Sequence, residues 1–450
     1  MRTTHLKYNT EINRRMSKRF AWLLGLVVLV AIGLLVACGD VYNSSYDGLV
    51  LVTSQGSGLL ETFSFGLNTG SIAPVDNPPD DTGTYTCVLN GLPSAIVVDP
   101  AGAYAYAILT ANQSICGSGS TSTGIIAFKV NSNGRLQQVG SLVPDPNPIG
   151  LVMDTTGKFL FVVEASLPAE GVPGMVNSYA IGSGGSLTAV GSYTPTLPPG
   201  LAFQTPDISA IAVTPMVLPG LVNGIQLGPC SSTRNNKPTS EYLYAADAQN
   251  NVVWEFVVNT STGALSTPLN VGYFFTGPAQ ATPAGVAVDA CDRFVYVTNA
   301  LTNNVAAYSI CNGLPSQSLT NCPTPPEAPD GSLVPVAGSP FSIPGSANGP
   351  GPILSDPFAN TIYVLDTQSN QVSTFRINQA SGGLTAGNPA TVGTGLGPTS
   401  FAIRGDDSWL FVANFNSATI SQYSITPSTG ALSGLPVTST DNQPWGVAVK

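Results

Sequence analysis

One short pattern recurs six times along the chain and limits what it can fold into. Each copy starts at a Pro or Ile, runs through an alternating apolar stretch, crosses a polar turn and ends in a second alternating stretch. The copies are PSAIVVDPAGAYAYAI from Pro93, PIGLVMDTTGKFLFVVE from Pro148, ISAIAVTP from Ile208 resuming as EYLYAAD at Glu241, PAGVAVDACDRFVYVTN from Pro283, PGPILSDPFANTIYVLD from Pro350 and PTSFAIRGDDSWLFVAN from Pro398. A pattern that recurs in this way along a chain is typical of architectures in which each repeated unit packs mainly against its neighbours.

Each copy continues with a third alternating run and, in most copies, a turn and a fourth. The third runs are IIAFKV (125–130), VNSYAI (176–181), VWEFVV (253–258), VAAYSI (305–310), VSTFRI (372–377) and ISQYSI (420–425). Short runs of period two bounded by Gly, Pro, Asn or Asp indicate strands, and the 48 Gly and 37 Pro of the chain favour turns over long helices. Four strands per unit predict the blade of a β-propeller.

The two ends of the repeat array are incomplete in complementary ways. Residues 47–75 match only the second, third and fourth strands of a unit, and the tail PWGVAVK (444–450) matches only a first strand. Joined in one sheet they make a seventh blade, which closes the ring and leaves no open edge at the junction. We therefore predict an all-β, seven-bladed propeller of four-stranded antiparallel blades over residues 47–450, with the C-terminal strand paired into the first blade.

The tetrapeptide YVTN stands at Tyr296–Asn299, inside a VxVDxxxxxxYVxN pattern. With these motifs the chain resembles the YVTN or lactonase-like seven-bladed propellers. The resemblance extends over nearly all of residues 47–450 and implies the same fold. It also implies a lactonase-type activity, of the kind associated with 6-phosphogluconolactone, as one function to consider. The shared motifs build the blade, however, and a fold alone does not define an activity.

The N-terminus has the layout of an export signal. In MSKRFAWLLGLVVLVAIGLLVAC, Lys18 and Arg19 precede an apolar run, and LVAC (35–38) resembles the lipobox of bacterial lipoproteins. We expect residues 1–37 to be a lipoprotein signal peptide, Cys38 to carry the lipid, and 38–46 to be a tether. Several acyl chains would hold the protein stably in a membrane of the bacterial cell envelope. The alternative is an uncleaved membrane helix, for which the apolar run is just long enough.

Charge and histidine content exclude several classes of function. The formal net charge is -10, and beyond residue 37 only 9 basic side chains face 24 acidic ones, so nucleic-acid binding is not expected. The only histidine is His5, which excludes His-dependent triads and His-ligated zinc from the predicted propeller. No GxSxG elbow and no phosphate-binding P-loop motif is present. A hydrolase would have to use carboxylates, Tyr, Lys or an oxygen-bound cation such as calcium.

One polar series recurs at the ends of the second strands. Its members are Ser54, Leu109, Glu164, Asp247, Asn299, Asp366 and Asn414. Five of them (Glu164, Asp247, Asn299, Asp366, Asn414) are candidates for a ring of oxygens that binds a cation or polar ligand in an axial funnel. The alternative is that short polar side chains cap the turns that follow, a role that Glu164 fits least. A second series, Asp99, Asp154, Asp289 and Asp356, is predicted to order the turns after the first strands.

Six cysteines follow Cys38, an even number that favours disulfides in an exported protein. Placing them on the predicted blades favours the pairs Cys87–Cys116, Cys230–Cys291 and Cys311–Cys322. Metal ligation is the weaker alternative, since no CxxC and no histidine lies nearby. Two inserts, at 215–240 and 311–330, emerge on one face of the propeller. They are either loops that tolerate insertion or part of a partner surface.

The sequence favours an envelope-anchored, monomeric binding or scaffold module for a protein or a small polar ligand. No catalytic residue can be assigned, and no cofactor is expected apart from a calcium ion in the funnel. The alternative is a lactonase-type hydrolase, like a 6-phosphogluconolactonase, that opens a sugar or other lactone. A phosphosugar pocket should gather basic side chains, and this sequence scatters them.

Overall fold

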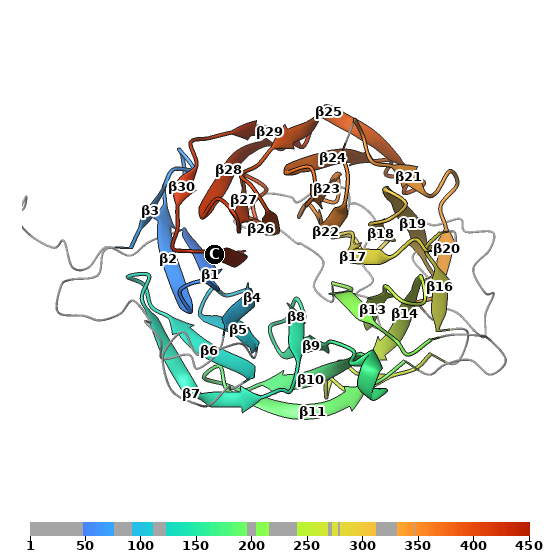
Figure 1. The fold of residues 1–450 in the computed structure, drawn as a ribbon, viewed down its shortest axis with the longest axis horizontal. Helices are drawn as coiled ribbons and strands as arrows, with labels where there is room; N and C mark the ends of the chain where they lie inside the picture. The colour runs from blue at the N-terminus through green and yellow to red at the C-terminus, as the bar shows by residue number, and fades with distance from the viewer. Residues whose placement is uncertain are drawn as a thin grey trace, which may run out of the picture. The chain divides into compact units, whose positions relative to one another are not determined.

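Seven antiparallel sheets stand around one axis in the computed structural model (Figure 1). The structure describes residues 48–75, 92–110, 123–195, 204–215, 241–268, 272–277, 280–311, 331–345 and 347–450. The predicted signal segment, Cys38, the predicted tether and nearly all of both inserts lie outside these residues.

Each sheet is one blade, with its first strand innermost. Blade 1 contains β31 (Pro444–Val449), β1 (Leu49–Ser54), β2 (Leu59–Phe65) and β3 (Ile72–Pro74); blade 2 contains β4 (Leu92–Val98), β5 (Tyr104–Thr110), β6 (Gly124–Val130) and β7 (Leu136–Pro144); blade 3 contains β8 (Pro148–Met153), β9 (Phe159–Glu164), β10 (Met175–Ile181) and β11 (Leu187–Tyr193). Blade 4 contains β12 (Ile208–Val213), β13 (Glu241–Asp247), β14 (Val252–Val258), β15 (Leu265–Ser266) and β16 (Tyr273–Phe275); blade 5 contains β17 (Pro283–Val288), β18 (Phe294–Asn299), β19 (Asn304–Ile310), β20 (Leu333–Pro335) and β21 (Phe341–Ser342). Blade 6 contains β22 (Pro350–Ser355), β23 (Thr361–Asp366), β24 (Gln371–Ile377) and β25 (Leu384–Gly393), and blade 7 contains β26 (Pro398–Ile403), β27 (Trp409–Asn414), β28 (Thr419–Thr426), β29 (Ala431–Gly434) and β30 (Thr438–Ser439).

The predicted fold and its closure are confirmed. Strand β31 pairs antiparallel with β1, so that Val447 lies opposite Val52 and the two ends of the propeller share one sheet. In blades 4, 5 and 7 the outermost strand is interrupted, and both of its pieces pair with the third strand. A single 3-10 turn, η1 (Pro168–Glu170), is the only helical element among the described residues, and none of the described helices is long or apolar enough to cross a membrane.

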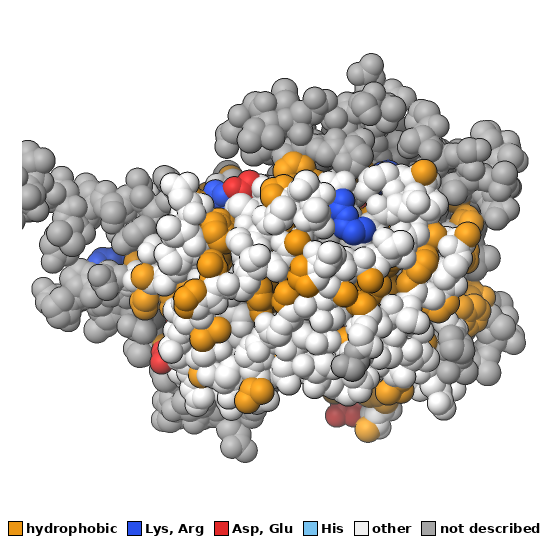
Figure 2. Space-filling view, turned by 90° about the horizontal axis from the view of Figure 1, so that it is seen from above, with side chains coloured by type: hydrophobic (Ala, Val, Ile, Leu, Met, Phe, Trp, Pro, Cys, Tyr) orange, Lys and Arg blue, Asp and Glu red, His pale blue; other side chains and the backbone are white. Residues whose placement is uncertain are grey.

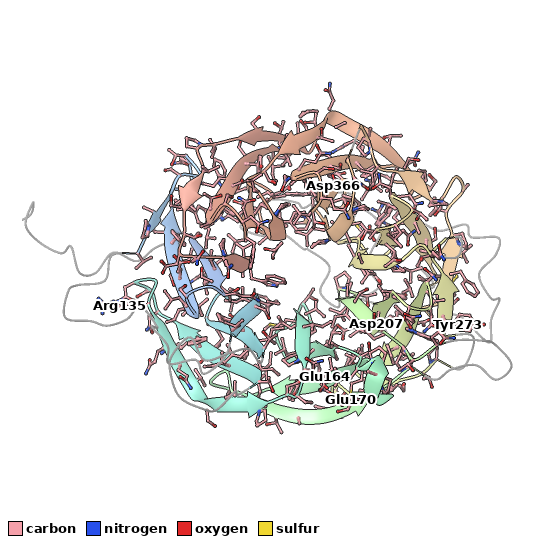
Figure 3. All side chains as sticks on the ribbon, in the orientation of Figure 1. Arg135, Glu164, Glu170, Asp207, Tyr273 and Asp366 are labelled. Atoms are coloured by element: carbon pink, nitrogen blue, oxygen red, sulfur yellow. The ribbon has the colours of Figure 1, made fainter. Side chains whose placement is uncertain are left out.

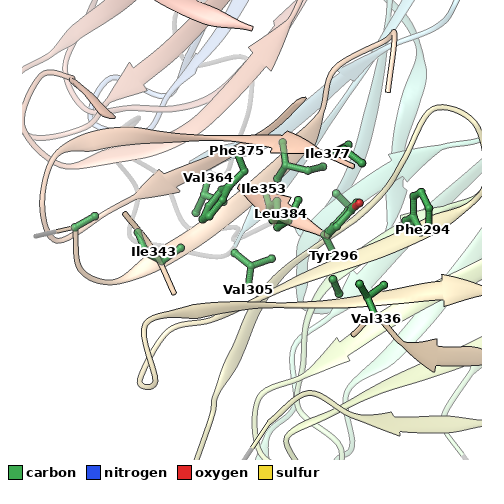
Figure 4. Packing of buried hydrophobic residues seen from close by; sticks show 14 residues of the cluster. Phe294, Tyr296, Val305, Val336, Ile343, Ile353, Val364, Phe375, Ile377 and Leu384 are labelled. Carbon is green, nitrogen blue, oxygen red and sulfur yellow. The ribbon is translucent and has the colours of Figure 1, made fainter. Parts of the chain in front are cut away.

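The hydrophobic core lies between the blades. The largest cluster joins blades 5 and 6, where Tyr296 and Val305 from one blade meet Ile362 and Phe375 from the next (Figure 4). Similar clusters occupy the other junctions, because alternate residues of each strand face one neighbouring blade or the other. The recurring aromatic side chains of the second strands supply much of this packing, since Tyr106, Phe161, Tyr296 and Phe411 are all at least 99% buried.

Hydrogen bonds from buried tyrosines tie neighbouring blades together. The hydroxyl of a second-strand tyrosine donates to the carbonyl of a turn glycine in the next blade: Tyr106 to Gly185, Tyr244 to Gly331, Tyr296 to Gly382 and Tyr363 to Gly430. Blade 3 has Phe161 at this position and lacks the hydroxyl. Its cross-strand partner Ser178 donates instead, to the carbonyl of Gly263 at 2.6 Å.

The aspartates after the first strands order the turns that lead to the second strands. Asp99 Oδ1 accepts the backbone N–H groups of Ala103 and Tyr104, and Asp154 Oδ1 accepts those of Lys158 and Phe159. The N–H groups that donate to each aspartate lie four and five residues after it, farther along the chain than in a simple Asx turn. The carboxylate therefore holds the two ends of the whole loop together. Blade 7 has Arg404 at this position, and there Asp406 accepts from both the Ser408 backbone and the Arg404 guanidinium.

Candidate functional site

A cavity of about 610 Å³ lies on the propeller axis. All seven inner strands line it, mostly with Val, Ile, Leu and Ala, and its polar side chains are the hydroxyls of Ser355, Thr399 and Ser400. No charged side chain is among the residues that line it. The volume is that of a pocket for a small molecule, and the lining suits a neutral one.

The strand directions define two faces of the propeller. On the upper face the inner strands begin, the second strands end, and the chain passes from blade to blade; on the lower face the first-to-second and third-to-fourth strand turns lie. The members of the polar series that end the second strands, from Ser54 to Asn414, are therefore all on the upper face. None of the seven is among the residues that line the axial cavity.

Most of this series is bound to the neighbouring third strand. Three members form a hydrogen bond with a side chain of the third strand, two residues beyond the residue that lies directly opposite them. These pairs are Ser54 with Glu61, Asp366 with Ser373, and Asn414 with Ser421. Asn299 donates to the carbonyl of Thr276 and to Asn304.

Asp247 accepts from the backbone of Asp207, Gln249 and Asn250 and from the indole of Trp254. These contacts are those of turn-ordering groups.

The candidate ring residues do not converge on one point. Glu164 and Asp366 come from blades 3 and 6, on opposite sides of the axis (Figure 3). Within the described ranges no group of three or more His, Cys, Asp or Glu side chains is placed to hold a metal ion. Burial raises the pKa of Asp366 to about 6, and the hydroxyl of Ser373 opposes this rise.

Glu164 belongs instead to a buried carboxyl pair with Asp145, a residue of the connection between blades 2 and 3. The two side chains are in hydrogen-bonding contact, and the amide of Asn177 donates to both of them. Tyr179 donates its hydroxyl to Asp145 Oδ2 at 2.7 Å, and Asp145 Oδ1 is buried without a hydrogen-bond partner. Glu164 and Asp145 are only 6% and 1% exposed.

Burial, reinforced by the neighbouring Asp145 carboxyl, raises the pKa of Glu164 to about 7. A carboxyl with this pKa exchanges a proton near neutral pH, which suits a general acid or base. The sequence pattern pointed to Glu164 as the exception in its series. It gave no sign of Asp145, because the connections between blades do not repeat and only the fold brings this one beside β9 and β10.

Among the described residues, basic side chains are confined to one face of the propeller, whereas acidic side chains occur on both. The described Lys and Arg side chains all lie at strand ends or turns of the lower face: Lys129, Arg135, Lys158, Arg293, Arg376, Arg404 and Lys450. The upper face holds carboxyl groups and, in its described part, no basic side chain. The side of the molecule in Figure 2 is mostly neutral, with scattered hydrophobic side chains and few charged ones.

Two cysteines lie within the described residues. Cys291 and Cys311 are buried and each is disulfide-bonded. Their predicted partners, Cys230 and Cys322, and the predicted pair Cys87 and Cys116 lie outside the described residues. The three pairings therefore stay predictions.

The fold is that of a seven-bladed β-propeller, and its sequence motifs resemble those of the lactonase-like propellers. Residues 234–449 match the family model described as lactonase, 7-bladed β-propeller, so the resemblance inferred from YVTN is confirmed. No curated protein matches the sequence.

Solved structures of the same fold are distant in sequence. A periplasmic gluconolactonase from Pseudomonas aeruginosa is 18% identical with a TM-score of 0.64, covering 89% of this chain and 98% of that one. A candidate 6-phosphogluconolactonase from Bacteroides fragilis NCTC 9343 is also 18% identical with a TM-score of 0.63, covering 91% of this chain and 100% of that one. A functionally unknown protein from Desulfotomaculum acetoxidans is 14% identical with a TM-score of 0.60, covering 89% of this chain and 98% of that one. At these identities the likeness establishes the fold alone.

Proposed function

We propose that this protein is a lactonase-type hydrolase that opens an uncharged lactone at the upper face of the propeller. The observation that carries the proposal is the Glu164–Asp145 carboxyl pair on that face, in a chain matched by the lactonase family model. The names of the Pseudomonas and Bacteroides neighbours, both lactonases, support the same class of reaction.

The charge distribution favours a substrate without phosphate. A phosphorylated sugar lactone is an anion and needs basic side chains or a metal ion to hold it. The described part of the upper face has carboxyl groups and no basic side chain, and the lining of the axial cavity is uncharged. A neutral lactone avoids the repulsion that these carboxyl groups would exert on an anion.

The chemistry assigned to Glu164 is general base catalysis. Its carboxylate takes a proton from a water molecule as the water oxygen bonds to the lactone carbonyl carbon. When the ring C–O bond breaks, protonated Glu164 returns this proton to the departing oxygen, so that the carboxylate is regenerated and the product is the open hydroxy acid. Asp145 and Asn177 hold the Glu164 carboxyl in place; burial and Asp145 raise its pKa to about 7, and the Asn177 amide opposes this rise.

The test compares lactone opening by the purified protein and by two variants in a pH-stat. We expect glucono-1,5-lactone to open faster than its spontaneous rate, and 6-phosphogluconolactone to open much more slowly. Glu164→Gln should lower kcat by about 10²–10⁴-fold, the usual contribution of a general base. Glu170→Gln, which changes an exposed carboxylate in the loop that follows Glu164, is the matched control and should leave the rate unchanged. Equal rates for Glu164→Gln and the wild type would exclude Glu164 as the base, and opening of the phosphorylated lactone alone would exclude the substrate class.

A second candidate function is binding without turnover. It is favoured by the uncharged lining of the axial cavity and by the hydrogen bonds that occupy most of the polar series. In that case a neutral sugar or lactone would raise the melting temperature while no acid is released in the pH-stat.

Location outside the cytoplasm is part of the same proposal. The signal layout of residues 1–37 supports it, and so does the periplasmic neighbour. Anchoring at Cys38 predicts that the protein takes up labelled fatty acid in cells and that Cys38→Ser abolishes the labelling.

A further inference from the structure

Seven equivalent positions, one per blade, stand at the upper ends of the inner strands, and three of them (Trp445, Ile149 and Thr399) line the axial cavity at this end, its mouth. Each is the residue after the Pro or Ile that pairs with the end of the second strand. In order from blade 1 they are Trp445, Ser94, Ile149, Ser209, Ala284, Gly351 and Thr399. Five of the seven are small, so the large side chain of Trp445 departs from what the blade geometry needs.

Trp445 lines the cavity and leaves part of its ring exposed. Its relative exposure is 37%, whereas the other described tryptophans, Trp254 and Trp409, are at least 92% buried and donate their indole N–H groups to protein acceptors. A ligand that covers this partly exposed indole would remove its apolar surface from water, and the rim of the cavity leaves the ring accessible to one.

A second aromatic side chain holds the indole in place. Phe415, in the loop after β27, meets Trp445 edge-on, with ring centroids 5.5 Å apart and an interplanar angle of 85°. The equivalent positions in the other blades are Gln55, Thr110, Ala165, Ala248, Ala300 and Thr367, none of them aromatic. The Thr399 hydroxyl also donates to the Trp445 carbonyl at 2.7 Å, which fixes the backbone. Two aromatic exceptions to the repeat therefore meet at one junction, between blades 7 and 1.

Polar groups around the indole are hydroxyls and not charges. Thr399 and Ser400 line the cavity beside Trp445, and Ser94, at the equivalent position of blade 2, has a buried hydroxyl without a hydrogen-bond partner. A flat aromatic face beside hydroxyl donors and acceptors matches a ring that has a C–H face and equatorial hydroxyl groups.

We propose that Trp445, supported by Phe415, is the platform on which the sugar-derived ring of a neutral lactone stacks at the mouth of the axial cavity. This inference rests on the proposed function for the ring's chemical class. Trp445 is the binding residue, and Phe415 is a positioning residue that acts through it.

The test measures binding of the lactam analogue of glucono-1,5-lactone, which keeps the ring and its hydroxyl groups but is not opened by water. Calorimetry gives Kd, and tryptophan fluorescence reports the site, because Trp445 is the exposed indole among those described. We expect the lactam to change the fluorescence of the wild type. Trp445→Leu, which keeps an apolar side chain but removes the π face, should raise Kd at least tenfold, and Trp445→Phe should raise it less. Phe415→Leu should raise Kd about threefold with Trp445 still present, and Leu301→Ala, which trims an exposed leucine elsewhere on the upper face, should leave Kd unchanged.

The outcomes separate this inference from the proposed function. The inference is overturned if the lactam does not bind, or if it binds Trp445→Leu as tightly as the wild type while both melt at the same temperature. If Trp445→Leu weakens lactam binding but the wild type opens no lactone, the platform stands and the hydrolase fails. If Glu164→Gln abolishes turnover while Trp445→Leu leaves the Kd of the lactam unchanged, the hydrolase stands and the platform fails.

Discussion

At the scale of single residues, the unusual feature of this propeller is its buried carboxyl groups. Burial, with nearby carboxyl groups contributing, raises the pKa of Glu241 and of Asp407 to about 8 each, and burial raises that of Asp356 to about 6. A carboxyl whose folded-state pKa is raised binds its proton more tightly when folded than when unfolded. Its contribution to stability is therefore complete below the unfolded pKa and is lost as the pH rises through the folded value.

This direction of the pH dependence predicts a protein that is more stable in mild acid than in mild base. Asp407 tests it best, because it is fully buried, neither of its carboxyl oxygens has a hydrogen-bond partner, and its positive φ of 56° is tolerated by asparagine. We expect the melting temperature of the wild type to fall between pH 5 and pH 8. Asp407→Asn should fall less and be more stable than the wild type by about 1 kcal/mol or more at pH 8, the equivalent of one pKa unit. Parallel curves for the two proteins in thermal unfolding would contradict the assignment.

At the scale of elements, the blades are held by a repeated contact between a strand and the next blade's turn. The alternating pattern of the second strands shows in the sequence where the aromatic residue of this contact lies. It did not reveal the acceptor, because a carbonyl some 80 residues away becomes a neighbour only when the blades are stacked. Blade 3 illustrates the point: Phe161 has no hydroxyl, and only the structure shows that Ser178 replaces the missing bond.

We expect Tyr296→Phe and Ser178→Ala to destabilise the protein by similar amounts, about 1–2 kcal/mol each, since either change leaves a buried carbonyl without its donor. Tyr104→Phe is the control, because the structure assigns its partly exposed hydroxyl no hydrogen bond. Chemical denaturation measures all three. A cost for Tyr104→Phe as large as for the other two would mean that the hydroxyl-to-glycine bonds are not the cause.

At the scale of the whole molecule, the ring is closed by β31, which joins residues at the two ends of the propeller. Its Pro444 lies opposite Ser54, and its backbone continues the sheet out to the pair Val449–Val50. The same strand carries Trp445, so the segment that completes the ring also supplies the proposed binding platform.

Deleting residues 445–450 should open the ring and lower the melting temperature severely, because the inner edge of β1 loses its partner and the core between blades 1 and 2 is exposed. A synthetic peptide of residues 442–450, added in excess, should restore part of the loss by mass action. If the truncated protein melts like the full chain, β31 does not close the propeller energetically.

The sequence by itself determined the blade count, the strand pattern and the closure, because these depend on local alternation and on a repeat that the sequence displays directly. It also excluded histidine chemistry and pointed to Glu164 as an exception in its series. The tertiary structure alone decided what surrounds these residues. Asp145 meets Glu164 through a connection between blades 2 and 3, and Phe415, in the turn after β27, meets Trp445 of β31 across the junction of blades 7 and 1. Such contacts join residues distant in sequence, so their geometry exists only once the seven sheets are packed around their axis.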